Sequence, residues 1–221
     1  MELNADFSAR VVVKTAENAW RTTPMQGVER KMLDRIGDEV ARATTIVRFA
    51  PNAEFHAHTH DGGEEFLVLD GVFEDEHGAF PAGSYIRNPP TSHHAPSAPQ
   101  GTTILVKLHQ FDPEDRTHVR IATQKSAAVP AAGRPGVAIL PLFVDGREDV
   151  RLETWSPGAE VQLEGHGGLE AFVLDGGFEE GGDTLGPWDW LRLPPGAPLK
   201  ARAGADGARL WVKTGHLVAL A

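Results

Sequence analysis

Residues 55–71 read Phe-His-Ala-His-Thr-His-Asp-Gly-Gly-Glu-Glu-Phe-Leu-Val-Leu-Asp-Gly, and this stretch decides what fold and site we expect. Three histidines, His56, His58 and His60, occupy alternate positions. Successive side chains of a strand point to opposite faces, so an extended backbone would place all three on one face. Two glycines then allow a tight turn, and Glu64 opens an apolar run. The pattern predicts nitrogen and oxygen metal ligands that converge from two adjacent strands.

Short apolar runs separated by turn residues continue through the whole chain. The 221 residues include 24 glycines and 16 prolines, many of them in small groups such as Gly62-Gly63 and Pro89-Pro90. This spacing predicts many short strands, and therefore an all-β sandwich or barrel. Residues 28–40 are the one segment where a helix can be argued, and Gly37 interrupts it.

The sequence also contains an internal repeat. Two blocks recur at an offset of 105 residues and a third at an offset of 106: residues 65–71, 81–90 and 101–107 align with residues 170–176, 186–195 and 207–213. Ordered blocks at a nearly constant offset indicate a duplication. We therefore expect two domains of one all-β fold, residues 1–115 and 116–221. Residues 119–123 resemble residues 11–15, so we expect them to form the first strand of the second copy.

The two copies differ in the residues that could carry chemistry. Six of the ten histidines lie in the central part of the first copy, whereas the equivalent part of the second copy keeps only His166. Four of the five tryptophans lie in the second copy. Folding alone does not explain this bias, so we expect metal binding in the first domain and a second domain without the full ligand set.

Composition excludes several classes of partner. The net charge is −10 and the basic residues are scattered, which argues against nucleic acid and anionic membranes as partners. The absence of cysteine excludes disulfides, thiolate zinc sites and a cysteine nucleophile. No run of roughly 20 apolar residues and no signal peptide is visible, so we expect a cytoplasmic protein.

The order of these motifs resembles the two motifs of the cupin superfamily. The matching elements are His58-x-His60-x-x-x-Glu64, then Gly71, then Pro81-x-Gly83, then a histidine followed by Ala95-Pro96. The resemblance implies tandem cupin barrels, also called double-stranded β-helices or jelly rolls. It also implies one divalent metal ion held by three histidines and one glutamate. Carried over residue by residue, the ligands are His58, His60, Glu64 and His94, with His94 preferred over its neighbour His93.

Four shorter segments narrow the resemblance to the ChrR-like cupins: residues 62–69, 75–78, 87–90 and 106–108. That group includes the cupin domain of the ChrR anti-sigma factor and dioxygenases that cleave dihydroxyacetophenone or acetylacetone. The resemblance implies a bicupin with a mononuclear non-haem metal, of the iron or zinc class, that acts on or senses a small molecule. One interpretation is a dioxygenase of small diketones or hydroxyketones, for which no catalytic residue can be named. The alternative is a regulatory metal-binding cupin without enzymatic activity, although the anti-sigma part of ChrR uses cysteine ligands that this sequence lacks.

Several alternatives stay open at this point. Three nitrogens and one oxygen suit zinc, iron, manganese or nickel alike. His56 could be an extra ligand or an exposed side chain, and we expect His77 to belong to a turn. In the second copy, alignment of the apolar runs places leucines at the Glu64 and His94 positions. A shift by one residue would instead give a second candidate set, Glu164, His166 and Glu170. The edges of the barrels also allow a homodimer.

Overall fold

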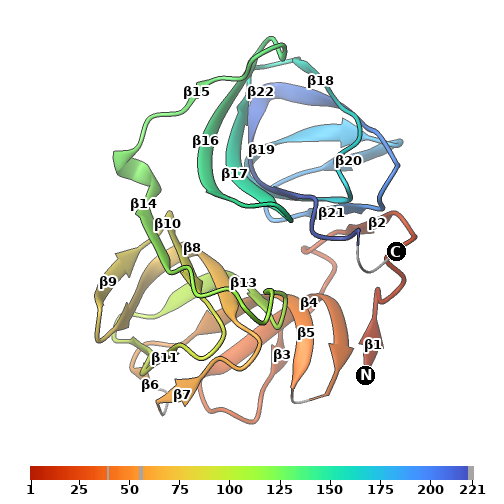
Figure 1. Cartoon of the computed structure of the whole chain (residues 1–221). Helices are drawn as coiled ribbons and strands as arrows, with labels where there is room; N and C mark the ends of the chain where they lie inside the picture. The colour runs from red at the N-terminus through yellow and green to blue at the C-terminus, as the bar shows by residue number, and fades with distance from the viewer. Residues whose placement is uncertain (39, 55–56, 219–221) are drawn as a thin grey trace. The chain divides into compact units, whose positions relative to one another are not determined.

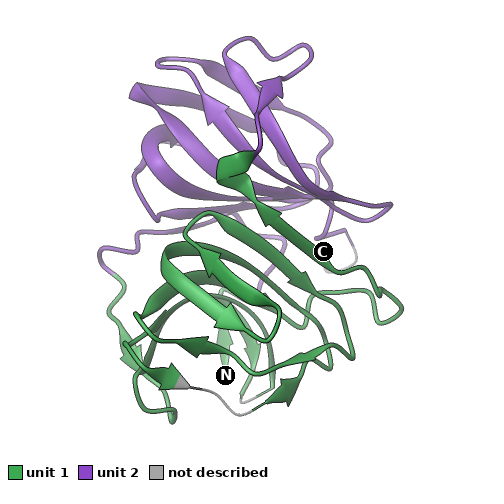
Figure 2. Cartoon of the chain, turned by 90° about the vertical axis from the view of Figure 1, so that its left-hand side faces the viewer, with its two compact units in different colours: residues 1–5, 18–125 green, residues 6–17, 126–221 purple. Residues whose placement is uncertain are grey.

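The computed structural model describes residues 1–38, 40–54 and 57–218, and all regular structure in them is β except one 3-10 turn, η1 (Thr123–Lys125). The chain forms two compact units (Figure 2). Unit 1 consists of residues 1–5 and 18–125, and unit 2 of residues 6–17 and 126–221. The predicted all-β class is therefore confirmed. No helix among the described residues is long and apolar enough to cross a membrane.

Unit 1 is built around one antiparallel sheet with the strand order β1-β4-β5-β13-β8-β10-β14 (Figure 1). Strands β7 and β11 form a separate two-stranded ladder, and β3, β6, β9 and β12 are short additions to the main sheet. The strands are β1 (Glu2–Leu3), β3 (Arg21–Thr22), β4 (Val28–Gly37), β5 (Ala41–Phe49), β6 (Ala53–Glu54), β7 (His58–Thr59), β8 (Glu64–Asp75), β9 (Gly78–Pro81), β10 (Ser84–Asn88), β11 (His93–His94), β12 (Ser97–Ala98), β13 (Thr102–Leu108) and β14 (Val119–Ala122).

Unit 2 repeats this arrangement, with the strand order β15-β16-β17-β22-β19-β21-β2. The pairs β17–β22, β22–β19 and β19–β21 match β5–β13, β13–β8 and β8–β10 of unit 1, which confirms the duplication. The strands are β2 (Val11–Val13), β15 (Val129–Pro130), β16 (Val137–Val144), β17 (Asp149–Trp155), β18 (Glu160–Leu163), β19 (Leu169–Glu180), β20 (Asp183–Leu185), β21 (Trp190–Leu193) and β22 (Leu199–Thr214).

One expectation about an individual segment is wrong. Residues 119–123 do not open the second barrel, because β14 pairs with β10 of unit 1. The similar segment near the N-terminus instead lies in unit 2, where β2 pairs with β21. The two equivalent strands are thus exchanged relative to their order in the sequence. Residues 28–37 are not helical; they form β4, which is hydrogen-bonded to β5.

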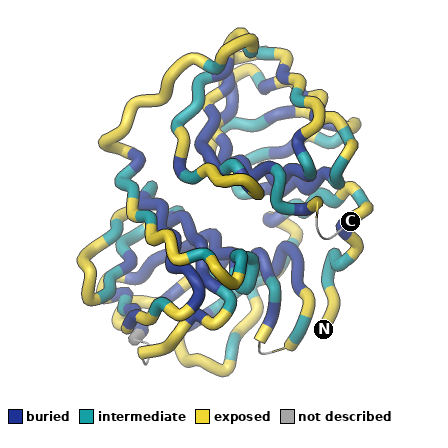
Figure 3. Tube along the Cα trace, viewed as in Figure 1, coloured by how far each residue is buried: buried dark blue, intermediate teal, exposed yellow. Residues whose placement is uncertain are grey.

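The inside of each barrel follows the two-residue period of its strands. On β8, Phe66 and Val68 belong to the hydrophobic core of unit 1. Glu64 has the same parity, so it faces the barrel interior, whereas Glu65 faces the opposite side. Buried residues dominate the central strands of both units (Figure 3). Glu64 therefore projects a carboxyl group into the barrel interior, beside the apolar core residues Phe66 and Val68.

A glycine fixes the bend in the middle of β8. Gly71 has φ = +72°, and a Cβ there would lie 2.2 Å from the carbonyl oxygen of Gly101. Gly176 has the equivalent geometry in unit 2, with the same 2.2 Å approach to the carbonyl oxygen of Gly207. The glycine that follows each Leu-Asp pair of the repeat is thus required by the backbone.

We expect Gly71→Ala to lower the free energy of unfolding by at least about 1–3 kcal/mol, which is the usual cost of a strained backbone conformation. The clash of the new Cβ with a backbone oxygen adds a further cost. Urea denaturation measures the change. Gly146→Ala is the matched control, since a Cβ at Gly146 meets nothing within 4 Å. Equal denaturation midpoints for the two variants would contradict this account.

Candidate metal centre

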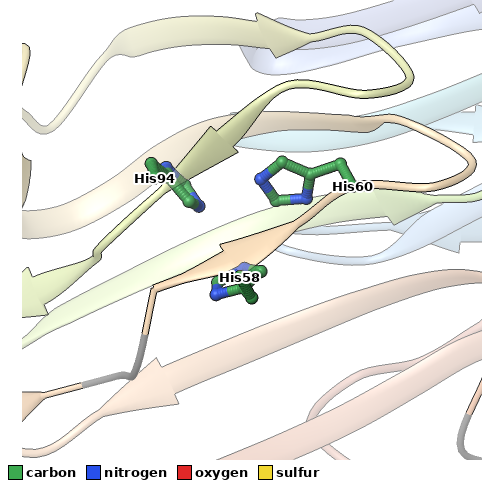
Figure 4. Close-up of side chains that lie close together, drawn as sticks. All are labelled: His58, His60 and His94. Atoms are coloured by element: carbon green, nitrogen blue, oxygen red, sulfur yellow. The ribbon is translucent and has the colours of Figure 1, made fainter.

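Two of the histidines face each other across a strand pair. In the β7–β11 ladder, His58 is the direct partner of His94. His60 follows β7, and its backbone continues the pairing: its N–H donates to the Ser92 carbonyl at 2.9 Å and its carbonyl accepts from the Thr91 N–H at 2.9 Å. The ladder therefore brings three imidazoles to one place (Figure 4).

The three rings converge closely. Their centroids lie 4.9 Å (His58–His60), 5.0 Å (His58–His94) and 4.6 Å (His60–His94) apart. One nitrogen from each ring lies within 4.8 Å of the others. His60 and His94 are buried, and within the described part of the chain their Nε2 atoms have no hydrogen-bond partner. Buried polar atoms without partners are costly, so these two nitrogens fit an absent ligand such as a metal ion.

Glu64 completes the group of converging atoms. Its Oε2 lies 3.6 Å from the Nε2 atoms of both His60 and His94. The Asn88 side chain, directly opposite on β10, donates to the same oxygen at 3.2 Å. The four residues expected as ligands therefore lie close together. Their three nitrogen atoms and one oxygen atom fit a donor set for a divalent metal ion.

Burial shifts the protonation of these groups. Burial, together with His94 and His58 nearby, lowers the pKa of His60 to about 3. The pKa of His94 is also lowered, because burial outweighs its hydrogen bond to Asp75. Burial raises the pKa of Glu64 to about 7, against the hydrogen bond from Asn88. His60 and His94 are therefore neutral at pH 7, which is the form that binds metals.

The site opens onto a cavity of about 580 Å³. Its walls include Met25, Phe49, Phe73, Ile104 and Leu108 beside the three residues His58, His60 and Glu64. None of the described residues that line it is a lysine or an arginine. The described lining is thus mostly apolar apart from the histidines, Thr59, Asp61 and Glu64.

Other residues singled out in the sequence lie elsewhere. His56 falls outside the described residues. His93 is exposed and pairs with Thr59. His77 forms a turn, in which its N–H donates to Asp75 Oδ1 at 2.7 Å. Glu65 faces away from the cluster and accepts from the Tyr85 hydroxyl at 2.5 Å.

Strand register shows what replaces the ligands in unit 2. Leu163 pairs with Leu199 as His58 pairs with His94, and Leu169 pairs with Leu193 as Glu64 pairs with Asn88. The alignment without a shift is therefore the right one. The shifted set of Glu164, His166 and Glu170 is not assembled, because Glu170 faces the other side of the sheet. There it pairs with Nε2 of His216 at 2.8 Å and accepts from Trp190 Nε1 at 3.2 Å.

Sequence reasoning missed three residues around the cluster. Asn88 bonds Glu64, Asp75 bonds His94, and His109 lines the cavity. Asn88 immediately precedes the Pro89-Pro90 motif, so its position at the end of an expected strand could have indicated that it lies near the site. Asp75 and His109 become neighbours of the site only through the fold.

The comparisons with known proteins agree with this geometry. Residues 8–112 match the ChrR cupin-like domain family. Among solved structures, a candidate dioxygenase from Nostoc punctiforme is similar, with a TM-score of 0.76 and 15% identity over 94% of this chain and 82% of that one. Bacterial pirin YhhW from Escherichia coli, solved in complex with nickel(II), has a TM-score of 0.67 and 13% identity over 93% of this chain and 98% of that one. A mutant of the oxalate decarboxylase of Bacillus subtilis has a TM-score of 0.64 and 12% identity over 92% of this chain and 76% of that one. The comparison with curated proteins gave no match.

The duplicated barrels share the two-barrel cupin fold of these solved structures. Residues 8–112, just under half of the chain, are the part that matches the ChrR cupin-like domain family. The histidine cluster belongs to this part of the chain.

The raised pKa of Glu64 predicts how the metal-free protein responds to pH. The folded value of about 7 exceeds the ordinary 4.5, so this group's contribution to stability is fully present below pH 4.5 and is lost as pH rises through 7. The loss is on the order of 3 kcal/mol. Glu64→Gln removes the titration but can still accept from Asn88.

Denaturant unfolding in the presence of a chelator, at pH 5 and at pH 8.5, measures the effect. We expect the wild type to lose stability relative to Glu64→Gln between the two pH values. A constant difference between the two proteins would show that Glu64 does not titrate in this way. Bound metal should reverse the trend, because the ligand must ionise to bind it.

Proposed function

We propose that the first barrel binds one divalent transition metal through His58, His60, Glu64 and His94, and that the chain uses this site to act on a small uncharged organic molecule. The observation that carries the proposal is the pair of buried, unpartnered Nε2 atoms, each 3.6 Å from the same Glu64 oxygen. The donor set suits iron, zinc, manganese or nickel, so residue identity does not choose among them. When bound, such an ion supplies a Lewis-acid or redox centre.

The residues that line the cavity favour one class of substrate. The apolar walls formed by residues such as Phe49, Phe73 and Ile104 favour an apolar body, and no lysine or arginine among the described lining residues is available for an anion. His109 and Asp61 are the titratable lining residues outside the proposed ligand set. A small diketone or hydroxyketone meets these conditions, because it carries two oxygen atoms and no fixed charge. We therefore favour a mononuclear non-haem dioxygenase of such molecules. The name of the Nostoc punctiforme structure agrees, but its likeness extends to the fold alone.

A regulatory module is the second candidate, and the match of residues 8–112 to the ChrR cupin-like domain favours it. A sensor would use the same cavity to bind a small molecule without turnover. The two functions differ in whether the bound molecule is consumed.

We expect one metal ion per chain in protein purified without added ions, measured by inductively coupled plasma mass spectrometry. The double variant His58→Ala/His60→Ala removes two donors and should lose the ion. Glu164→Ala is the matched control from the alternative set in unit 2, and it should retain one ion per chain. A ratio of two in the wild type, or an ion retained by the double variant, would contradict a single site in the first barrel.

We also expect the iron(II)-loaded protein to consume oxygen with at least one member of a panel of neutral diketones and aryl hydroxyketones. An oxygen electrode measures the rate, and the double variant His58→Ala/His60→Ala should abolish it. Binding of a panel member without oxygen uptake would favour the sensory function. The absence of both binding and oxygen uptake would refute the proposed substrate class.

A further inference from the structure

The turn between β8 and β9 reaches the histidine cluster from outside the cavity. Oδ2 of Asp75, the last residue of β8, lies 3.2 Å from Nδ1 of His94, and both side chains are 2% exposed. Oε2 of the next residue, Glu76, accepts from the Ala95 N–H at 3.0 Å. Two successive acidic residues of the turn thus hold two successive residues of the segment that carries His94.

Asp75 is itself held in place. Its Oδ1 accepts from the His77 N–H at 2.7 Å, so one carboxylate oxygen is engaged within the turn while the other faces the imidazole. The ring of Phe73, two residues earlier on β8, packs beside His94 with 5.8 Å between centroids. The imidazole of His94 is therefore fixed by a hydrogen bond at one nitrogen and by an aromatic contact along its side.

The turn does not offer a second metal site. Asp75, Glu76 and His77 do place potential ligand atoms within 4.8 Å of one another. However, both oxygens of Asp75 are already engaged, and Glu76 bonds the backbone of Ala95. The hydrogen bonds of Asp75 and Glu76 to the segment that carries His94 explain why these acidic side chains lie together.

We propose that Asp75 is a positioning residue for His94. A neutral imidazole carries a proton on only one nitrogen, and a carboxylate can only accept. Asp75 therefore holds the proton on Nδ1 and leaves the lone pair on Nε2, the atom that faces Glu64 and the other two histidines. This inference rests on the proposed metal-binding function. A carboxylate behind a ligating histidine fixes both the ring orientation and the tautomer, and its loss typically costs about 10–100-fold in metal affinity.

The test compares Asp75→Asn with Asp70→Asn, which removes an equal charge from an exposed position on the same strand. The dissociation constant for zinc(II), measured by competition with a chromophoric chelator at fixed pH, should rise about 10–100-fold in Asp75→Asn. It should stay within about twofold of wild type in Asp70→Asn. An Asp75→Asn protein that binds zinc as tightly as wild type would overturn the proposal.

A second measurement needs no metal, and its decisive result comes from the wild type. In the metal-free wild type, ¹⁵N NMR of the histidine side chains should show His94 as the Nδ1–H tautomer, and Asp75→Asn should lose this preference. The Nε2–H tautomer in the wild type would refute the role of Asp75, even if Asp75→Asn fails to fold. If the wild type binds no zinc but His94 is the Nδ1–H tautomer, the metal site fails and the positioning contact stands.

Discussion

The structure of the site depends on one antiparallel register, the pairing of His58 with His94 in the short β7–β11 ladder. A slip by one residue would turn one of the two rings to the opposite face and break the cluster. The backbone of His60 extends the same ladder, and the turn beyond it is closely packed. A Cβ at Gly62 would lie 2.2 Å from the His109 ring, and one at Gly63 would lie 2.4 Å from the Phe111 ring. The two glycines are required because the segment that follows β13 occupies this space.

The second barrel keeps this register and changes the side chains. Leu163, Leu169 and Leu199 belong to its apolar interior at the positions of His58, Glu64 and His94. In the same barrel, Glu153 is buried and accepts from Arg134 at 2.8 Å, from Arg151 at 2.7 Å and from Trp155 at 2.7 Å. The arginines lower the pKa of Glu153 despite its burial, so this carboxylate is held in its charged form. The two barrels thus share one backbone fold but have different interiors, and the side chains inside each barrel determine its chemistry.

The repeat and the spacing of turn residues predicted two all-β domains, and the resemblance to cupins indicated the residues that meet in the cluster. The helix considered for residues 28–40 failed for a local reason. The pairing of β4 with β5 shifts register between Met32 and Asp34, so four successive residues, 32–35, are buried and the two-residue period is lost. The strand β14 was assigned to the wrong barrel because equivalent strands of the two barrels have similar sequences, and the sequence does not show which barrel each strand completes. Asp75 was missed because 19 residues separate it from His94 and only the fold joins them.

The exchange of β2 also has a consequence for the order in which the protein can assemble. Val11 pairs with Arg192, so β2 and its strand partner are separated in the sequence by residues 18–125 of unit 1. Non-local pairing of this kind slows folding, because a long loop must close before the contact forms. During synthesis, residues 6–17 leave the ribosome before all of β21 and stay without their strand partner until β21 follows. Unit 2 is therefore completed only after the intervening residues 18–125 have been made, and its two segments are joined in one sheet.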